Sequence, residues 1–223
     1  MSSPRHAWRT RIIVPPSQPA IIDIPDGEAA AARRCNSLRW PSRHHAAARL
    51  RTENVLESLM YSSLAIANEF ISRALAEGKK LTPMQIQKLV YLAHGWNLAV
   101  TGEPLIRGKF EAWDWGPVNR PLYEALRQFG AEPVDEFIRW GEGSPFSEDD
   151  DFGPDAIEDL TPKEHEIIDR TWRAYGEYEA FQLSALTHTK GTPWANVYSQ
   201  GRNREVLNSE IQEYFIRLAD SPE

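Results

Sequence analysis

Apolar side chains recur at helical spacing along most of the chain, and this pattern predicts a mainly α-helical protein. A first helix is expected over residues 52–77, with Gly78 as its stop. Its buried face would consist of residues three and four positions apart, namely Ala67, Phe70, Ile71, Ala74 and Leu75. The two lysines that follow Gly78 complement the negative end of such a helix.

The second predicted helix begins at the sequence Leu-Thr-Pro-Met-Gln (residues 81–85) and ends at Gly102. Thr82 can cap its N-terminus, and Gln85 can reach back to the amide of the cap residue. Its main apolar stripe comprises Ile86, Leu89, Val90, Ala93, Asn97 and Val100, while Tyr91 and Leu98 lie off that stripe. A helix that is apolar on more than one side is expected at the centre of the domain.

Residues 110–118, Phe-Glu-Ala-Trp-Asp-Trp-Gly-Pro-Val, have the most unusual composition in the chain. They predict an extended, aromatic segment that ends in a sharp corner at the Gly-Pro pair. In an extended segment Trp113 and Trp115 would share one face. Asn119 can then cap a helix that stops at Gly130, with apolar positions Leu122, Tyr123, Leu126 and Phe129.

The remaining pattern predicts an extended segment, a loop and further helices. Residues 141–159 are rich in Gly, Pro, Ser and acidic residues and are expected to form a mobile surface loop. Helices are expected over residues 160–176 and 179–187, then one or two turns from residue 193 and a last helix from residue 209. The fold class is therefore mainly α. We expect a single compact domain of about six helices with a short extended corner, covering residues 52–220.

Residues 1–59 differ from the rest, because they contain six Pro, nine Arg and three His but no Phe, Tyr or Lys. Residues 1–51 are predicted to be a disordered extension. A transit peptide and a basic arm for nucleic acid are alternatives, although the prolines would break the amphipathic helix of a transit peptide. A further alternative is that these residues lie upstream of the true start, near Met60.

The charge of the chain is unevenly distributed. The formal net charge of −7 combines +5 over residues 1–55 with −12 over residues 56–223. An acidic body argues against nucleic-acid binding as the main role of the folded domain. Cys35 is the single cysteine, so an internal disulfide is excluded and a cytoplasmic location is expected. No apolar run approaches the ~20 residues that a membrane span needs.

Candidate chemistry is sparse. Asp114, His94, His165 and His188 show no spacing typical of a metal site, and the sequence contains no phosphate-binding loop. We therefore expect no enzyme activity, cofactor or metal. His188 is expected to cap carbonyl groups at a helix end. A small hydrolase that uses Asp114 and His188 is the weaker alternative.

Protein binding is better supported, because Trp113 and Trp115 are large aromatic side chains of the kind that dominate interfaces. The alternative is that both belong to the core. Gly116 and Pro117 are expected to shape the corner rather than touch a partner. The acidic surface would suit a basic partner.

Four segments together resemble a known family. They are Leu-Thr-Pro at residue 81, Gln-Lys-Leu-Val-Tyr-Leu-Ala-His-Gly-Trp at residue 87, the aromatic corner at residue 110, and Leu-Ser-Ala-Leu-Thr-His with the later Thr-Pro-Trp at residues 183–194. In order and spacing they are similar to the Panacea domain of SocA-like antitoxins, a family that also contains phage-associated GepA-type proteins. The resemblance covers residues 60–215.

This resemblance implies an antitoxin that binds and neutralises a cognate protein toxin encoded nearby. The routes left open are sequestration of the toxin and its delivery to the Clp protease, which would then be a second partner. A phage-associated interaction module without a toxin is the alternative. The expected partner-binding residues are Trp113, Asp114, Trp115, Gly116, Pro117, Val118, Tyr123, His188, Pro193 and Trp194.

Overall fold

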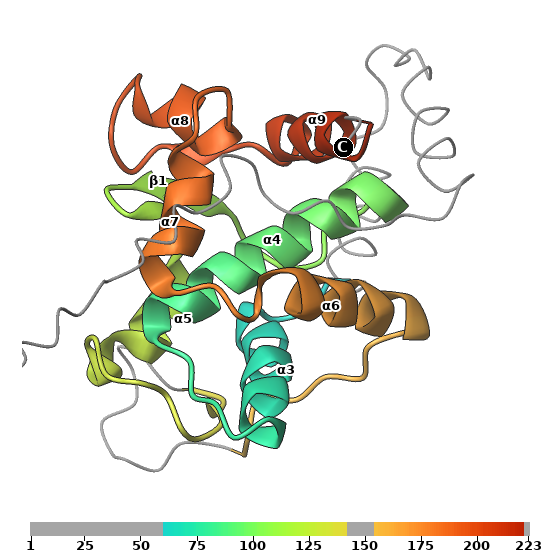
Figure 1. Ribbon diagram of the computed structural model, residues 1–223, viewed down its shortest axis with the longest axis vertical. Coiled ribbons are helices and arrows are strands. Elements are labelled where there is room, and N and C mark those ends of the chain that lie inside the picture. Colours follow the sequence, from blue (N-terminus) through green and yellow to red (C-terminus); the bar gives the residue numbers. More distant parts are fainter. Residues whose placement is uncertain (1–59, 142–153, 221–223) are drawn as a thin grey trace, which may run out of the picture.

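A computed structural model describes residues 60–141 and 154–220 of the chain. Within them the chain forms seven α-helices, one short 3-10 helix and three short strands, which confirms the mainly α fold (Figure 1). The predicted extension over residues 1–51, the proposed helical residues 52–59 and the middle of the predicted acidic loop, residues 142–153, lie outside the described residues. None of the helices in the described part combines the length and the apolarity that crossing a bilayer demands.

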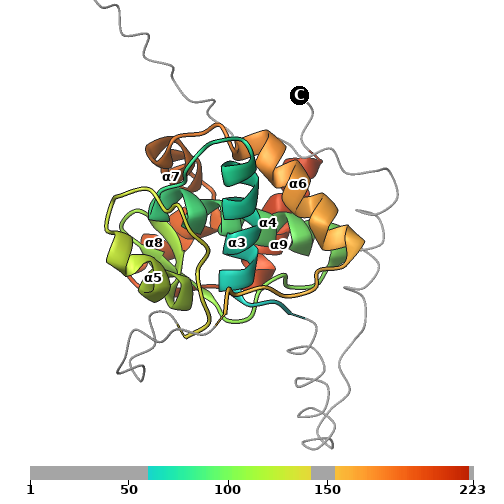
Figure 2. The same ribbon diagram turned by 90° about the horizontal axis from the view of Figure 1, so that it is seen from below.

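Helix α4 (Pro83–Thr101) lies at the centre of the fold, as its sequence predicts. In Figure 1, α9 (Asn208–Ala219) lies on one side of it, and α3 (Ser63–Ala76) and α6 (Pro162–Tyr175) lie on the other. Figure 2 shows α3 crossing in front of α4. Because neighbours surround it, every residue of α4 from position 86 to position 100 is buried.

The predicted capping device at Thr82 is present, and a similar one opens α6. The side chain of Thr82 accepts a hydrogen bond from the amide of Gln85, and the Gln85 side chain accepts one from the amide of Thr82 at 2.9 Å. At the start of α6, the Glu164 carboxylate accepts from the amide of Thr161 at 3.0 Å. Paired donors and acceptors of this kind satisfy backbone groups that a helix end leaves free, so each helix starts where the sequence predicts.

Helix α3 begins later than predicted. Residues 60–62 are not helical, because the amide of Tyr61 donates to the carbonyl of Leu105 at 2.9 Å and the amide of Arg107 donates to the carbonyl of Tyr61 at 2.8 Å. Ser62 then caps the helix by accepting from the amide of Leu64. The expectation that Leu75 is buried is also wrong, since it is 37% exposed at the last turn.

The aromatic segment folds into a hairpin of β1 (Phe110–Trp113) and β2 (Gly116–Asn119), and β3 (Glu205–Val206) pairs with the other edge of β1. All pairings are antiparallel, and Trp113 lies opposite Gly116. Asp114 and Trp115 therefore form a two-residue turn. The predicted continuous extension through Trp115 is wrong, because the chain reverses one residue before Trp115 rather than at the Gly-Pro pair.

Three further helices complete the surroundings of the hairpin. Helix α5 (Arg120–Leu126) begins at Asn119, whose side chain accepts from the amide of Leu122 as predicted, and it continues into the 3-10 helix η2 (Arg127–Phe129). Helices α7 (Ala180–His188) and α8 (Pro193–Tyr198) follow α6. Figure 1 shows α7 and α8 beside the hairpin, at the end of the molecule opposite α6.

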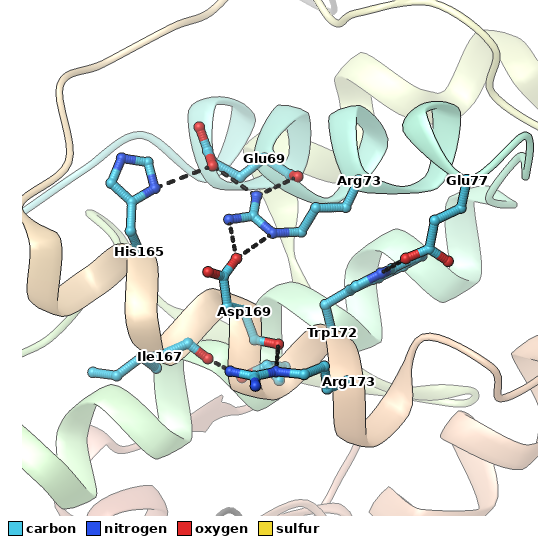
Figure 3. A network of polar contacts seen from close by, with 9 residues as sticks. Glu69, Arg73, Glu77, His165, Ile167, Asp169, Trp172 and Arg173 are labelled. Carbon is cyan, nitrogen blue, oxygen red and sulfur yellow. Dashed lines mark hydrogen bonds and ion pairs between the residues drawn. The ribbon is translucent and has the colours of Figure 1, made fainter.

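A polar network joins α3 to α6 (Figure 3). The guanidinium of Arg73 donates to the carboxylate of Glu69 at 2.7 Å and, through Nε and one terminal nitrogen, to Asp169 at 2.9 and 2.6 Å. The indole of Trp172 donates to Glu77 at 2.7 Å. Because the Arg73 side chain is only 18% exposed, this cluster is a cross-link between two helices rather than a fully solvated pair.

The end of the predicted acidic loop is fastened to the body. Ala156 is fully buried, and its amide donates to the carbonyl of Ile138 at 2.8 Å. The side chain of Asn68, which is itself buried, donates to the carbonyls of both residues and accepts from the amide of Ile138. Residues 154–158 therefore belong to the folded body and not to a free surface loop.

Candidate functional site

The turn of the hairpin is held through its backbone by side chains of α7 and α8. Three successive carbonyl groups, those of Trp113, Asp114 and Trp115, each meet a side-chain nitrogen or hydroxyl. The partners are the indole of Trp194 at 2.9 Å, the Nε2 atom of His188 at 3.1 Å and the hydroxyl of Ser184 at 3.0 Å, respectively. These three contacts hold the backbone of the turn against α7 and α8.

The second strand of the hairpin is held in the same way from α4. The ammonium group of Lys88 donates to the carbonyl of Pro117 at 3.0 Å. The amide side chain of Gln87 donates to the carbonyl of Asn119 at 3.1 Å and accepts from its amide at 3.0 Å. All four of these residues are buried, so α4 supplies the polar partners that this strand does not receive from a neighbouring strand.

Gly116 permits the close approach of the hairpin to α4 and α7. Its φ of +106° lies in the region that favours glycine. A Cβ atom there would lie 2.6 Å from the hydroxyl oxygen of Thr187 and 2.7 Å from Cε of Lys88. The prediction that Gly116 shapes the corner agrees with this packing.

Lys88 is the most unusual charged residue of the site, because its side chain is 1% exposed. In the part of the chain that the structure describes, the carbonyl of Pro117 is its hydrogen-bond partner and no carboxylate forms an ion pair with it. Burial without a counter-charge lowers the pKa of Lys88 to about 7. The Lys88 side chain therefore lies on the inner side of the hairpin with N–H donors that no acid of the described residues engages.

The aromatic side chains of the tip point outward. Trp113 is half-buried, with its ring centroid 4.8 Å from that of Tyr123 and its indole donating to Glu111. Trp115 is 61% exposed, and its nearest aromatic neighbour is Phe181 on α7, with centroids 6.0 Å apart. The alternative that both tryptophans are core residues is wrong for Trp115.

Asp114 and His188 do not form a catalytic pair. The carboxylate of Asp114 accepts from the hydroxyl of Tyr198 at 2.8 Å and pairs with Arg202 at 3.0 Å. The ring of His188 meets backbone carbonyls instead, that of Asp114 and, at 2.6 Å from Nδ1, that of Ser184 in its own helix. The expectation that His188 caps carbonyl groups agrees with these contacts, and the ring bridges α7 and the turn.

Beside the hairpin lies a groove of about 690 Å³, which we call the tryptophan groove. The start of α4, the hairpin, α5 and the loop after α8 form its walls. Its lining consists of Pro83, Met84, Gln87, Lys88, Trp113, Asp114, Trp115, Val118, Tyr123, Leu126, Arg127, Gly130, Arg202 and Asn203. A volume of this size is in the range of sites that bind a drug-sized ligand or several side chains of a partner.

The structure divides the predicted partner-binding residues into two groups. Trp113, Asp114, Trp115, Val118 and Tyr123 line the tryptophan groove. Gly116, Pro117, Pro193 and Trp194 are buried behind it, and His188 is half-buried there. The second group therefore positions the first, and a direct role in binding is proposed only for the residues that line the groove.

The basic residues of the groove, Lys88, Arg127 and Arg202, are not predicted from the sequence. Arg127 and Arg202 come from segments far apart in the chain, and no local pattern joins them. A signal for Lys88 does exist, since it lies within the apolar run of a helix predicted to be buried on more than one side. A lysine in such a run is buried together with its neighbours.

The other candidate histidines have structural surroundings. His94 is fully buried, with Nε2 3.0 Å from the side-chain oxygen of Asn208, and burial lowers its pKa to about 4. His165 lies on α6, with Nδ1 3.5 Å from the carboxylate of Glu69. Among the described residues no cluster of His, Cys, Asp and Glu could hold a metal ion.

With this geometry in place, comparison with known proteins identifies the domain. Residues 86–195 match the family model described as antitoxin SocA-like, Panacea domain. The chain carries a Panacea domain. Antitoxin SocA of Caulobacter vibrioides (strain NA1000 / CB15N) is 35% identical over 135 residues, which are 58% of this chain and 66% of that protein. No solved structure matches the chain significantly.

The Panacea match contains the five side chains that hydrogen-bond to the backbone of the turn and of the second strand. Gln87 and Lys88 of α4, Ser184 and His188 of α7, and Trp194 of α8 lie within residues 86–195. Part of the groove lies outside the match, namely Pro83, Met84, Arg202 and Asn203. The hairpin and its supports are thus elements of the Panacea domain itself, and flanking segments complete the groove.

Proposed function

We propose that this protein is an antitoxin that binds and neutralises a protein toxin encoded nearby, with the tryptophan groove as its contact surface. The observation that carries the proposal is an exposed Trp115 on a hairpin whose turn is fixed by three side-chain contacts. The similarity to a protein named antitoxin SocA supports the same role.

A fixed hairpin suits this role for an energetic reason. Ordering a loop on binding costs conformational entropy, and a surface that is already ordered avoids that cost. Tryptophan also contributes a large contact area together with an N–H donor, which is why it dominates interface hot spots. Trp115 combines both properties, and Trp113, whose N–H donates to Glu111, adds contact area. Neutralisation by such a surface needs no chemistry of its own, and we propose that it takes place in the cytoplasm.

Two routes of neutralisation are compatible with direct binding. In the first, the complex simply blocks the toxin. In the second, the antitoxin delivers the toxin to the Clp protease and is itself released. The half-life of the toxin in cells with and without Clp distinguishes them, because only delivery makes the toxin short-lived in a Clp-dependent manner.

The proposal is tested by expressing each neighbouring gene from an inducible promoter, alone and together with the full chain, and by scoring growth. We expect one neighbour to be toxic and this protein to restore growth. If neither neighbour is toxic, the antitoxin role is wrong, and an interaction module without a toxin, as in a phage-associated protein, becomes the better proposal.

Variants then test the surface. The double substitution Trp113→Ala and Trp115→Ala is expected to abolish rescue while the protein remains folded. The matched control is the double substitution Ile157→Ala and Leu207→Ala, because these apolar residues are 64% and 49% exposed but do not line the groove. Full rescue by the tryptophan variant would show that the toxin binds elsewhere.

A further inference from the structure

The tryptophan groove is apolar along most of its length. Met84 of α4, Trp113 and Val118 of the hairpin, and Tyr123 and Leu126 of α5 contribute carbon surface to it. Removing such surface from water is favourable, so an apolar ligand gains affinity here. The lining alone, however, does not say what kind of ligand fits.

The charges along the groove are mostly basic in a protein that is acidic as a whole. Four charged residues line it, and three of them are the bases Lys88, Arg127 and Arg202. The one acid, Asp114, is already engaged by Arg202 and by the hydroxyl of Tyr198. The formal net charge of the chain is −7, so this lining is a local exception. It favours an acidic ligand, whereas the overall charge favours a basic partner.

Two of these bases keep unused N–H donors, Arg127 at the surface and Lys88 in the buried wall of the groove. Arg127 is 71% exposed at its side chain and meets Glu124 at 3.4 Å, a surface pair of a kind that contributes little and exchanges easily. Lys88 carries three N–H donors, and in the described part of the chain one acceptor, the carbonyl of Pro117, faces them. A carboxylate would supply the counter-charge that this buried side chain lacks, and burial has lowered the pKa of Lys88 to about 7 for want of one.

The apolar surface extends beyond the groove. Trp115 stands at its rim, and Phe181 on α7, which is 68% exposed, lies next to Trp115 without lining the groove. A small molecule that fills the groove would leave Phe181 uncovered. A polypeptide segment that continues out of the groove would cover both rings.

We propose that the tryptophan groove receives an apolar segment of the toxin that carries carboxylate side chains, with the carboxylates at Lys88 and Arg127 and the apolar side chains against Trp113 and Trp115. This inference rests on the proposed function for the identity of the partner. The chemistry of the groove itself, an apolar site for anions, is independent of that function and is tested separately.

The first test uses an aromatic anion and no toxin. Purified full-length protein is titrated with 8-anilinonaphthalene-1-sulfonate, and binding is followed by probe fluorescence. We expect saturable binding that Arg127→Glu weakens at least tenfold and Trp113→Ala at least fivefold. Arg170→Glu, the same charge change on α6 outside the groove, is the matched control and is expected to bind as the wild type does. Equal affinity of Arg127→Glu and Arg170→Glu would overturn the anion site.

The second test uses the toxin identified by the growth assay. Arg127→Glu and Lys88→Met are expected to weaken its binding at least tenfold and to reduce the salt dependence of the dissociation constant, while Arg170→Glu leaves both unchanged. Thermal unfolding confirms that each variant is folded. Rescue of growth with unaltered toxin binding by these variants would overturn this inference and leave the antitoxin role standing. Absence of any toxic neighbour would overturn the toxin as occupant and leave the first test to decide the chemistry of the groove.

Discussion

The Nζ atom of Lys88 lies 3.0 Å from the carbonyl oxygen of Pro117, and this hydrogen bond joins the central helix to the second strand of the hairpin. Gly116, which directly precedes Pro117, packs against the same lysine side chain. One buried lysine therefore sets how closely the hairpin approaches α4, and it also places an ammonium group in the lining of the tryptophan groove. The same side chain therefore takes part both in the packing of the hairpin and in the proposed binding.

Gly116→Ala is expected to lower the free energy of unfolding by roughly 2–4 kcal/mol, because the added methyl group meets Thr187 and Lys88 and the backbone conformation disfavours alanine. Urea denaturation measures the change. Gly191→Ala is the matched control, since Gly191 has a similar φ of +89° but nothing within 4 Å of its Cβ position. That control is expected to cost about 1 kcal/mol from backbone strain alone. Equal losses in the two variants would show that the close packing at Gly116 relaxes freely.

Lys88→Met is expected to stabilise the protein at pH 6 by roughly 2–4 kcal/mol, because it removes a charge that is buried without a counter-charge. Burial lowers the pKa of Lys88 to about 7 in the folded state, so between that pH and the ordinary value of 10.5 the unfolded chain binds more protons. The stability of the wild type therefore rises with pH across this window, and its penalty is complete below it.

Denaturation curves at several pH values check this expectation. The gain from Lys88→Met should shrink as the pH approaches 10. Lys80→Met, a change at a half-exposed lysine paired with Asp135, is the control and should show no such trend across this window. A gain that is independent of pH would contradict the lowered pKa of Lys88. Taken with the binding test, Lys88→Met is expected to be more stable than the wild type and to bind its partner less well.

His94 is expected to make the protein sensitive to mild acid. Its Nδ1 atom accepts from the amide of Ile106 at 3.4 Å, and Nε2 faces the side-chain oxygen of Asn208, so the neutral ring satisfies both contacts. Burial lowers the pKa of His94 to about 4, and the unfolded chain binds the proton first as the pH falls through 6.5. This contribution to stability is present above pH 6.5 and is lost between 6.5 and 4.

The His94→Gln variant tests that window. It is expected to be less stable than the wild type at pH 7.5 but to lose less stability on acidification, by up to about 1.4 kcal/mol per pH unit, the value for one proton. His165→Gln, which removes a half-exposed histidine of α6, serves as the control. Parallel acid profiles of the wild type and His94→Gln would show that other groups govern acid unfolding.

Arg73→Ala is expected to cost roughly 1–2 kcal/mol of stability, because it breaks the partly buried cross-link from α3 to Asp169 of α6 and leaves Glu69 without its arginine. Thermal unfolding at low and high salt measures it. Arg170→Ala removes an arginine whose pair with Glu166 stays within α6, and it should change stability by no more than about 0.5 kcal/mol. If the two variants lose the same stability, the network in Figure 3 is no cross-link.

Local signals account for much of the fold. The capping boxes at Thr82 and Thr161 and the apolar period between caps predict the helices α4 and α6 nearly to the residue. These features depend only on neighbours three and four positions away. The start of α3 was predicted too early, because Tyr61 is held in extended form by residues 105–107, which no local pattern reveals.

The candidate site was predicted in part for the same reason. Trp113 and Trp115 stand out by composition, and Gly116 by its place in a corner. The direction of the two indoles was not predictable, since the hairpin turn and the contact with Phe181 fix it. Arg127 and Arg202 lie 75 positions apart in the chain, and only the fold brings both into the lining of the groove.

The sequence by itself determined the helical class, the central helix, the aromatic corner and the resemblance to Panacea domains, because period, caps and motifs are properties of short segments. Only the tertiary structure decided which side chains face outward and which charges line the groove. Burial and electrostatic environment are set by residues distant in the chain. Lys88, for example, is buried where Gly116 and Pro117 of the hairpin pack against its side chain.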